Sequence, residues 1–408
     1  MRSSDQQEPT VSHFHRNGKR CTKYFFPEGE HVLREPIELD DFDIIEGACA
    51  QSTCIKVEGA FAGPVIRSKR LKTCCEGALW LHEEGVPVRF SIKNITIDFS
   101  GWTPEEDSFD FDHGNLARCG IGVFGKAFVI ENVTLMNVPG SGMISIGSNR
   151  GGKKDYYLDS PEAKIIGLEI TNTKDDGLVF AGPHDSLLDD IIVSISKHKG
   201  VYIVADKKVN GACDIGFIHA YATNSFAIDV QAKIKARFLQ GDTGRGGGVV
   251  IGGSNKSVID IVEAYKTREA RDGTPAYSIH VSAIESQIGL MRIRADGGAD
   301  GLYLGGSGNV IGNLHVVAGT RHSGGKMLEK QSPPVPIALD GHANTIVYGR
   351  IVEARSEVLK VLKETEERHF TANLSVDFSD FDQAEQAYCA NQFGNSMITI
   401  NNNAERLP

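Results

Sequence analysis

The stretch GLVFAG, residues 177–182, places a short apolar strand pattern between two glycines. Related segments recur along the chain: GVYIVAD at 200–206, SFAIDVQ at 225–231, GVVIGG at 248–253, AYSIHVS at 276–282, GLYLGG at 301–306 and PIALDG at 336–341. Their starts lie 23, 25, 23, 28, 25 and 35 residues apart. Each segment is followed by a longer alternating pattern, such as IIVSIS at 191–196. Periods of this length indicate a solenoid, and alternation with a period of two indicates strands.

The repeat therefore predicts an all-β parallel β-helix, a solenoid of about ten coils. Glycine is frequent, at 45 of 408 residues, and Gly, Asn, Asp and Ser connect the strand patterns, as turns require. An antiparallel β-sandwich is the competing fold, but it does not explain why the same pattern returns in the same phase. We expect a leader or cap over residues 1–23, the β-helix over 24–351, and less regular coils with a cap over 352–408.

Composition limits the functions that the chain can have. The net charge of −10 argues against a nucleic-acid partner, since phosphate binding needs concentrated Lys and Arg. No run approaches the ~18 apolar residues of a membrane span. Residues 1–12 are polar, so we expect no secretory signal, and hence a cytoplasmic protein or a mature secreted or virion form. The eight cysteines lack zinc-binding spacing, so we expect them to be reduced and partly buried.

Residues between the apolar positions of each repeated strand should point outward and form two columns. The first column holds Val179, Tyr202, Ala227, Val250, Ser278, Tyr303 and Ala338. The second holds Ala181, Val204, Asp229, Gly252, His280, Gly305 and Asp340. The turns before the strands add Asp175, Asp176, His198, Lys199 and Arg245. One face of the solenoid should thus carry carboxylates, imidazoles, phenols and cations.

The N-terminal part carries a family resemblance. FFPEGEH at 25–31, followed by an apolar strand and IIEG at 44–47, resembles the opening of the pectate-lyase-like superfamily of right-handed parallel β-helix proteins. With the coils, the resemblance extends over about residues 24–352. It implies a right-handed helix and a carbohydrate substrate, because the superfamily contains pectin hydrolases, polysaccharide lyases, uronate epimerases, fructan transferases and viral tailspike depolymerases. Related proteins are often trimers, so a homo-oligomer is one arrangement that the resemblance allows.

The resemblance also suggests roles for individual residues. Pectin hydrolases have an Asp-Asp pair on one coil and a Gly-His-Gly on a neighbouring coil, which Asp175, Asp176 and His198 approximate. The sequence lacks the family's third Asp, where VPGSG stands at 138–142, and it lacks the Arg-Ile-Lys motif. AGPHD at 181–185 resembles the Asp-Pro-His motif of mannuronan epimerases, with Gly182 replacing the Asp.

Glycosidic hydrolysis, or intramolecular transfer, needs two carboxylates near the scissile bond. The candidate catalytic residues are Asp175, Asp176, Asp229, His198 and His280, and the candidate substrate-binding residues are Lys199, Tyr202, Lys233, Arg245 and Tyr303. This chemistry requires no metal or cofactor. Asp before Gly is also an ordinary turn residue. Two alternatives stay open: a lyase or uronate epimerase, which would bring in Ca²⁺ if acidic groups such as those at 105–113 bind it, and a non-catalytic binding or spike protein.

Overall fold

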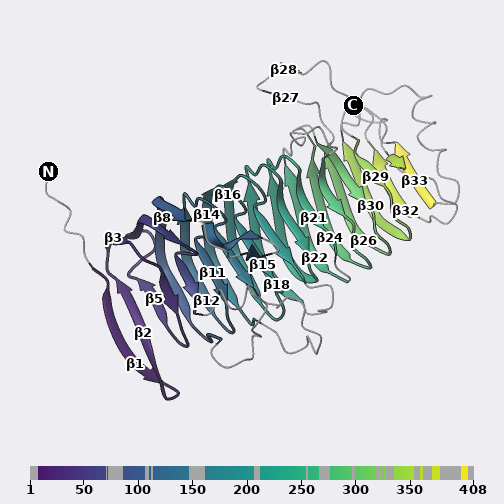
Figure 1. Ribbon diagram of the computed structural model, residues 1–408. Coiled ribbons are helices and arrows are strands. Elements are labelled where there is room, and N and C mark those ends of the chain that lie inside the picture. The colour runs from purple at the N-terminus through teal and green to yellow at the C-terminus, as the bar shows by residue number, and fades with distance from the viewer. Residues whose placement is uncertain are drawn as a thin grey trace. The chain divides into compact units, whose positions relative to one another are not determined.

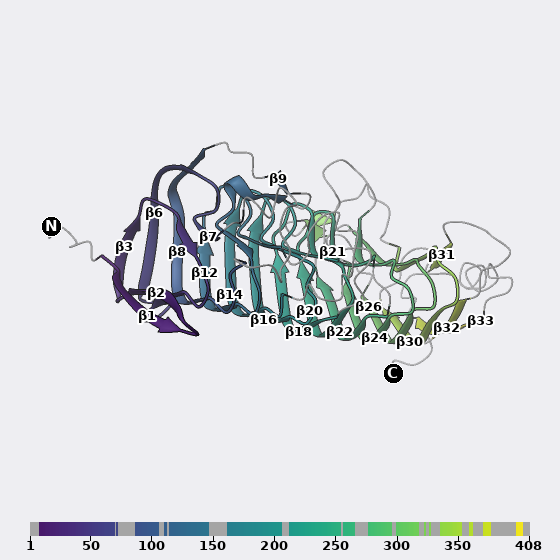
Figure 2. The same ribbon diagram turned by 60° about the horizontal axis from the view of Figure 1, so that its bottom comes forward.

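The computed structural model divides into two compact units, Met1–Ile218 and His219–Pro408. It describes residues 8–69, 71, 86–105, 110–111, 114–146, 161–205, 212–253, 256–265, 276–295, 299–317, 322–323, 326–327, 335–352, 359–361, 370–376 and 397–402. Figure 1 and Figure 2 show strands stacked side by side within each unit. The units are described in turn, and the domain boundaries expected at residues 23/24 and 351/352 remain predictions.

In the first unit, two kinds of strand alternate along the chain and form two sheets. The hairpin β1 (Thr10–Arg16) and β2 (Lys19–Phe26) is antiparallel, and the coils after it pair in parallel. The long-strand sheet continues with β3 (Gly29–Leu33), β5 (Ile44–Gly47), β6 (Thr53–Ala62), β8 (Ser91–Glu105), β12 (Val129–Met136), β14 (Lys164–Thr173) and β16 (Leu187–Ser196). The short-strand sheet contains β4 (Ile37–Leu39), β7 (Ile66–Ser68), β11 (Ile121–Phe124), β13 (Met143–Ile146), β15 (Leu178–Ala181) and β17 (Val201–Val204). The smaller elements are β9 (Asp110–Phe111), β10 (Gly114–Asn115) and the 3₁₀ turn η1 (Leu116–Arg118).

The second unit repeats this arrangement. Its long strands are the end of β18 (Cys213–Tyr221), β20 (Ile234–Asp242), β22 (Val258–Tyr265), β24 (Gln287–Arg294), β26 (Val310–Val317), β30 (Asn344–Val352), β32 (Phe370–Val376) and β33 (Met397–Asn402). Its short strands are β19 (Phe226–Gln231), β21 (Gly247–Ile251), β23 (Tyr277–Val281), β25 (Asp300–Leu304), β29 (Ile337–Leu339) and β31 (Leu359–Val361). β27 (His322–Ser323) and β28 (Lys326–Met327) form a two-residue antiparallel pair.

Four successive coils of the first unit bend inside their long strands, each at a residue with left-handed backbone. Asn94, Asn132, Gly167 and Asp190 occupy equivalent places in β8, β12, β14 and β16, with φ between 53° and 66°. Asn and Gly adopt this conformation at the lowest cost. Asn132 also donates a hydrogen bond to Asn94 over 3.1 Å, which joins neighbouring coils. These bends turn each long strand so that apolar residues on both sides of the bend reach the core.

The core of each unit consists of apolar stacks from coil to coil. In the first unit, Ile92, Ile130, Ile165 and Leu188 pair in sequence across β8, β12, β14 and β16, and all four are fully buried. In the second unit, Val262, Met291 and Leu314 form a corresponding stack. Every coil buries its apolar residues against its neighbours, which is how a solenoid forms a continuous core.

A column of buried polar side chains also joins the coils of the second unit. Ser257, Ser286, Asn309 and Asn344 are each at most 1% exposed. The backbone N–H of Ser257 donates to the Ser286 hydroxyl oxygen, that of Ser286 to the Asn309 side-chain oxygen, and that of Asn309 to Asn344, over 3.2, 3.1 and 2.9 Å. We call these four residues the acceptor ladder. The ladder satisfies buried N–H groups that would otherwise lose their hydrogen bonds to water.

Several sequence predictions are confirmed here. The fold is an all-β parallel β-helix, and Gly29 in the FFPEGEH stretch has a left-handed backbone, with φ +122°. His31 is fully buried, contacts the Phe26 ring edge-on at 5.3 Å, and forms a 2.8 Å hydrogen bond with the Pro27 carbonyl. The cysteines that the structure describes are free thiols, and Cys21, Cys119 and Cys213 are buried. No helix among the described residues is long and apolar enough to cross a membrane.

The predicted outward columns are wrong in register in the second unit. Asp229, Val250, His280 and Tyr303 share one row, because Asp229 pairs with Val250, Val250 with His280, and His280 with Tyr303. The cause is the small residue of each strand. A Cβ atom at Gly248 would lie 2.6 Å from the Ser278 carbonyl oxygen, so the close packing at this position requires glycine. Ala227 and Ser278 occupy the place of this glycine, which shifts their segments by two residues.

Candidate functional site

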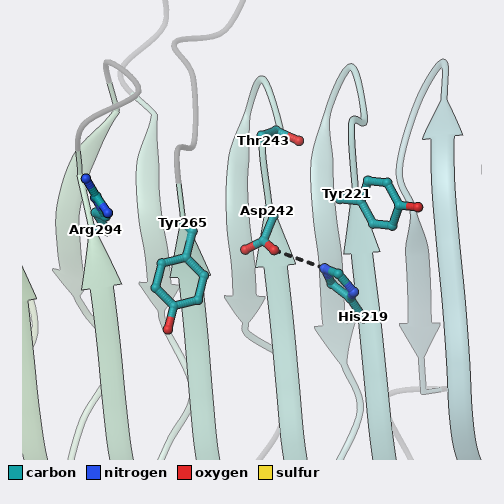
Figure 3. A pocket seen from close by; sticks show the side chains of 6 residues that line it. All are labelled: His219, Tyr221, Asp242, Thr243, Tyr265 and Arg294. Carbon is teal, nitrogen blue, oxygen red and sulfur yellow. Dashed lines mark hydrogen bonds and ion pairs between the residues drawn. The ribbon is translucent and has the colours of Figure 1, made fainter. Parts of the chain in front are cut away.

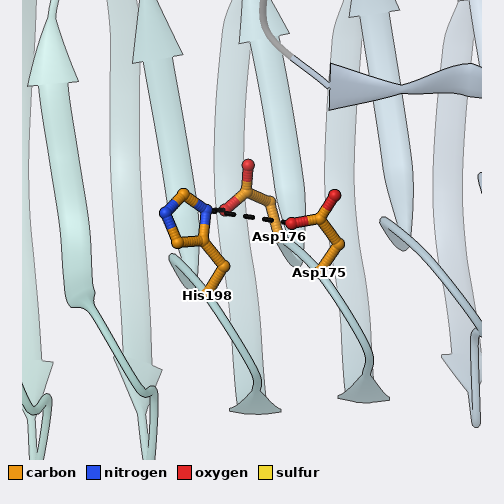
Figure 4. A group of neighbouring side chains, drawn as sticks. All are labelled: Asp175, Asp176 and His198. Atoms are coloured by element: carbon orange, nitrogen blue, oxygen red, sulfur yellow. Dashed lines mark hydrogen bonds and ion pairs between the residues drawn. The ribbon is translucent and has the colours of Figure 1, made fainter. Parts of the chain in front are cut away.

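Asp175, Asp176 and His198, which the sequence predicts to act together, lie close to one another at the turns that enter β15 and β17. Asp175 and Asp176 precede β15, and His198 lies one coil later, before β17 (Figure 4). The Nδ1 atom of His198 lies 2.6 Å from the Asp176 Oδ1 atom and 3.8 Å from the Asp175 Oδ1 atom. The sequence prediction that these three residues lie together is therefore correct in its geometry.

Asp176 is the buried member of this cluster. Its side chain is 6% exposed, whereas those of Asp175 and His198 are 38% and 51% exposed. The backbone N–H of Lys199 also donates to Asp176 Oδ1, over 2.8 Å. An ionised carboxylate only accepts hydrogen bonds, so the bond to ionised Asp176 places a proton on His198 Nδ1 and leaves Nε2 as the atom that exchanges protons. Asp176 thus orients the imidazole, while Asp175 and His198 face solvent.

The environments of the two exposed groups shift their pKa values in the same direction. Burial raises the pKa of Asp175, and the neighbouring charge of Asp176 raises it further. The hydrogen bond to Asp176 raises the pKa of His198. Between these two pKa values, Asp175 is ionised and His198 is protonated. The pair then consists of a strengthened carboxylate base beside an imidazolium acid.

The predicted binding residues of this unit lie next to the cluster. The Lys199 Nζ atom sits 3.4 Å from the centre of the Tyr202 ring, which is a close cation–π contact. Tyr202 is partly buried and packs against a cluster that includes Val179. Because Lys199 follows His198 directly in the chain, its ammonium group and the Tyr202 ring lie next to the acid–base pair of Asp175 and His198.

The same three residues could also hold a cation. Asp175, Asp176 and His198 each offer one ligand atom, and these atoms lie within 4.8 Å of one another. Ca²⁺ prefers six to eight oxygen ligands, and a nitrogen-containing set suits a transition metal better. The 2.6 Å separation of His198 and Asp176 is that of two atoms sharing a proton.

Part of the face predicted to be open is covered. Val179 belongs to the first outward column, yet it is fully buried in a cluster with Leu116, Ala117, Phe124 and Ile144. Leu116 and Ala117 belong to η1, within an insertion between β8 and β11. The insertion therefore packs over the outer face of the short strands here, and the polar groups of this coil are exposed at the turn. Of the acidic segment 105–113, residues 106–109 and 112–113 lie outside the described residues.

The second unit holds another group of predicted residues. Asp229 is 5% exposed and accepts a 2.7 Å hydrogen bond from Gln231. Burial lowers the pKa of His280, against the opposing effect of the Asp229 charge. His280 is thus held toward its neutral form, in contrast to His198 in the first unit.

Two tyrosine rings, those of Tyr277 and Tyr303, lie beside His280. The rings of His280 and Tyr303 lie 4.3 Å apart, and those of Tyr303 and Tyr277 lie 5.1 Å apart. The Tyr303 hydroxyl donates to Asp340 over 2.7 Å. A Cβ atom at Gly305 would lie 2.6 Å from the Tyr303 ring, so this glycine leaves the space that the ring occupies. Tyr277, His280 and Tyr303 form an aromatic surface with polar tips, the kind of surface on which a sugar ring stacks.

Three other predicted residues stand apart from these clusters. Lys233 and Arg245 lie in the turns before β20 and β21, and neither side chain forms an ion pair with a described residue. His184 of the epimerase-like segment lies 3.1 Å from Asp185, and its side chain is 22% exposed.

Sequence reasoning missed Tyr277 and Gln231 at the second-unit cluster. It also missed a group on the long-strand sheet that includes His219, Asp242, Tyr265 and Arg294. The signal was present in the second strand pattern of each coil, where polar residues alternate with core residues, as in FIHAY at 217–221. That pattern predicts strands, but it does not by itself show which outward residues align from coil to coil.

Comparison with known proteins supports the fold. No family model matches the sequence, and no curated protein matches it. The A-module of the mannuronan C-5 epimerase AlgE4 of Azotobacter vinelandii is similar in structure, with a TM-score of 0.50, 14% identity, and coverage of 85% of this chain and 90% of that one. The periplasmic alginate epimerase AlgG gives a TM-score of 0.48 at 12% identity, over 94% and 85% of the two chains.

A GH87 α-1,3-glucanase catalytic unit from Streptomyces thermodiastaticus gives a TM-score of 0.46 at 10% identity, over 94% of this chain and 63% of that one. At such identities, similarity concerns the fold alone, and the match to the AlgE4 module supports it. The chain is a right-handed parallel β-helix. The fold serves several carbohydrate chemistries, so the reaction has to be argued from the site.

Proposed function

We propose that this protein is a carbohydrate-active enzyme that cleaves glycosidic bonds in an oligo- or polysaccharide bound near the turns that enter β15 and β17. The observation that carries the proposal is the cluster of Asp175, Asp176 and His198, in which a buried carboxylate orients an imidazole beside a second, more exposed carboxylate. Glycosidic hydrolysis needs an acid and a base at the scissile bond, and the pKa values of both candidate groups, His198 and Asp175, are shifted here.

In the proposed reaction, the His198 imidazolium donates its Nε2 proton to the glycosidic oxygen as the bond to the anomeric carbon breaks. Asp175 takes a proton from the attacking water, whose oxygen forms the new bond to that carbon. If a sugar hydroxyl attacks instead of water, the same two groups carry out intramolecular transfer. Asp176 acts as a positioning residue. Lys199 and Tyr202 supply a charged and an aromatic contact for the sugar.

The test is a product screen with purified protein and separate neutral and uronic polysaccharides, each with and without a chelator. Products heavier than the residue sum by one water indicate hydrolysis. The Asp175→Asn variant should lower the rate by about 10²-fold or more, the usual worth of a positioned base. An unchanged rate in this variant would refute the assignment. Loss of activity with the chelator would assign the cluster to a metal instead.

A second reaction class has its own supporting observation. His280 is held toward its neutral form and lies beside Tyr303, so a base and a phenol proton donor adjoin each other in the second unit. This pair suits proton abstraction next to a uronate carboxylate, the first step of β-elimination or epimerisation. Products with an ultraviolet-absorbing double bond, lost in His280→Ala and retained in Asp175→Asn, would favour it. Binding without any product would favour a non-catalytic β-helix.

A further inference from the structure

The second unit has a pocket on its long-strand sheet, whereas the His280 cluster lies on the short strands. The pocket is open to solvent and has a volume of about 450 Å³, within the usual range for small ligands. It is lined by His219, Tyr221, Asp242, Thr243, Tyr265 and Arg294 (Figure 3).

The pocket extends across the ends of four long strands. His219 and Tyr221 come from the end of β18, Asp242 from β20, Tyr265 from β22 and Arg294 from β24. Asp242 pairs in register with Tyr265, and Tyr265 with Arg294. Neighbouring strands are about 4.8 Å apart, so this row is about 14 Å long from first strand to last. A ligand that contacts the whole row is an extended chain lying across the strands.

The imidazole at one end of the row is held in place. His219 Nε2 lies 2.9 Å from Asp242 Oδ2, and Gln240 donates to the same oxygen over 2.9 Å. The ring centres of His219 and Tyr221 are 4.9 Å apart. The other oxygen of Asp242, Oδ1, is buried without a hydrogen-bond partner among the described residues. The pocket wall therefore has an unsatisfied acceptor beside a fixed imidazole and an aromatic ring.

The aromatic ring of Tyr265 is also fixed. Its hydroxyl donates to Glu263 over 2.8 Å, and Arg292 holds the other oxygen of Glu263 over 2.6 Å. Burial, followed by the hydrogen bond to Glu263, raises the pKa of Tyr265 to about 12. The phenol is thus neutral at physiological pH, and the ring presents a rigid surface. Rigid aromatic groups lose little conformational entropy when a ligand stacks on them.

The far end of the row is positively charged. Arg294 lines the pocket, and Arg292, His315 and Arg350 form a register-paired row beside it, in which the Glu263 carboxylate already balances the charge of Arg292. Burial lowers the pKa of His315, and the charges of Arg350 and Arg292 lower it further. Although the whole protein is acidic, this part of the sheet favours an anion. A guanidinium group pairs with a carboxylate through two parallel hydrogen bonds.

We propose that this pocket is a second saccharide-binding site, which takes a short acidic oligosaccharide. Sugar rings would stack on Tyr221 and Tyr265, hydroxyls would bond with His219 and Asp242, and a sugar carboxylate would pair with Arg294. The site does not depend on the proposed catalytic role of Asp175. A nucleic acid is not favoured, because it would need many more cations along its path.

The experiment measures binding by calorimetry in the full-length Asp175→Asn variant, in which the proposed cleavage is suppressed. The probes are a hexuronic acid tetrasaccharide and a glucose tetrasaccharide. We expect the hexuronic acid tetrasaccharide to bind more tightly than the glucose tetrasaccharide. The Arg294→Gln variant should weaken binding of the hexuronic acid probe at one class of sites by about tenfold or more. Tyr265→Ala should weaken both probes at that site. Arg237→Gln, an exposed change on β20 outside the pocket, is the control and should alter neither.

Circular dichroism confirms that each variant is folded before binding is compared. Uronic binding that is unaffected by Arg294→Gln and Tyr265→Ala would overturn the proposal. Equal binding of the two probes would overturn the preference for acidic sugars. Because the readout is binding, absence of turnover in the native protein would refute the proposed hydrolysis and leave this site standing.

Discussion

Asp176 controls the proton on His198 in the proposed mechanism. The hydrogen bond between them raises the pKa of His198, so the alkaline limb of the pH–rate profile should lie above the ordinary histidine value of about 6.5. In Asp176→Asn we expect this limb to move down toward that value. Imidazole titration by NMR and the rate profile should agree. Asp214→Asn, a change of an exposed carboxylate in the same unit, should leave the limb in place.

The same pair gives a prediction for stability. Because the pKa of His198 is raised in the folded protein, its charged form stabilises the fold fully below about pH 6.5, and this contribution is lost as the pH rises through the folded value. Asp176→Asn should therefore reduce the free energy of unfolding more at pH 5.5 than at pH 9. Denaturant titrations at both values measure the difference, and an equal loss at both would contradict it.

At the scale of elements, the glycine that precedes β15 sets how closely its coil stacks on the next one. A Cβ atom at Gly177 would lie 2.2 Å from the Val193 side chain and 2.5 Å from the Gly200 carbonyl oxygen. We expect Gly177→Ala to cost about 1–3 kcal/mol, as overpacking usually does. Gly246→Ala is the matched control, since its nearest contact is 3.4 Å. Urea unfolding midpoints measure the loss of stability in each variant. Similar losses of stability in both variants would show that the contact at Gly177 is unimportant.

The acceptor ladder provides the second prediction at this scale. The Asn309 side-chain nitrogen donates to the Ala283 carbonyl at 2.8 Å and to Asn344 at 3.0 Å, while its oxygen accepts the Ser286 N–H. Asn309→Ala leaves several of these groups buried and unpaired, so we expect a loss of about 1–3 kcal/mol or more. Asn313→Ala, on the outer face of β26, should change the unfolding midpoint much less. If both variants unfold alike, the ladder has no special role.

The elements could be predicted largely because their period is local information. Alternation and Gly-centred turns identified the strands, and an Asp-Asp-Gly turn followed one coil later by a histidine identified the first-unit cluster. The row of Asp229, His280 and Tyr303 was placed in the wrong register, because Ala227 and Ser278 substitute for glycine and only close packing reveals that equivalence. Likewise, the sequence does not show that η1 covers Val179, since that contact joins an insertion to a distant strand.

At the scale of the whole molecule, the division into two compact units predicts how the protein unfolds. Both tryptophans, at positions 80 and 102, fall within the sequence range of the first unit, so we expect tryptophan fluorescence to report on that unit. Far-ultraviolet circular dichroism reports on the strands of both units. We expect the two signals to change at different urea concentrations, as separate units do. Coincident transitions would show that the two units unfold as one cooperative array.

The acceptor ladder also has a consequence for biosynthesis. The backbone N–H groups of Ser257, Ser286 and Asn309 each donate to a residue of the coil that follows, so a newly made coil lacks its partner until the next one is translated. At about 5–20 residues per second, a further coil emerges within a few seconds. The nascent chain should therefore gain order from the N-terminal side onward, with one coil at the ribosomal end always waiting for its successor. A stalled ribosome should leave that last coil sensitive to proteases while the coils before it resist digestion.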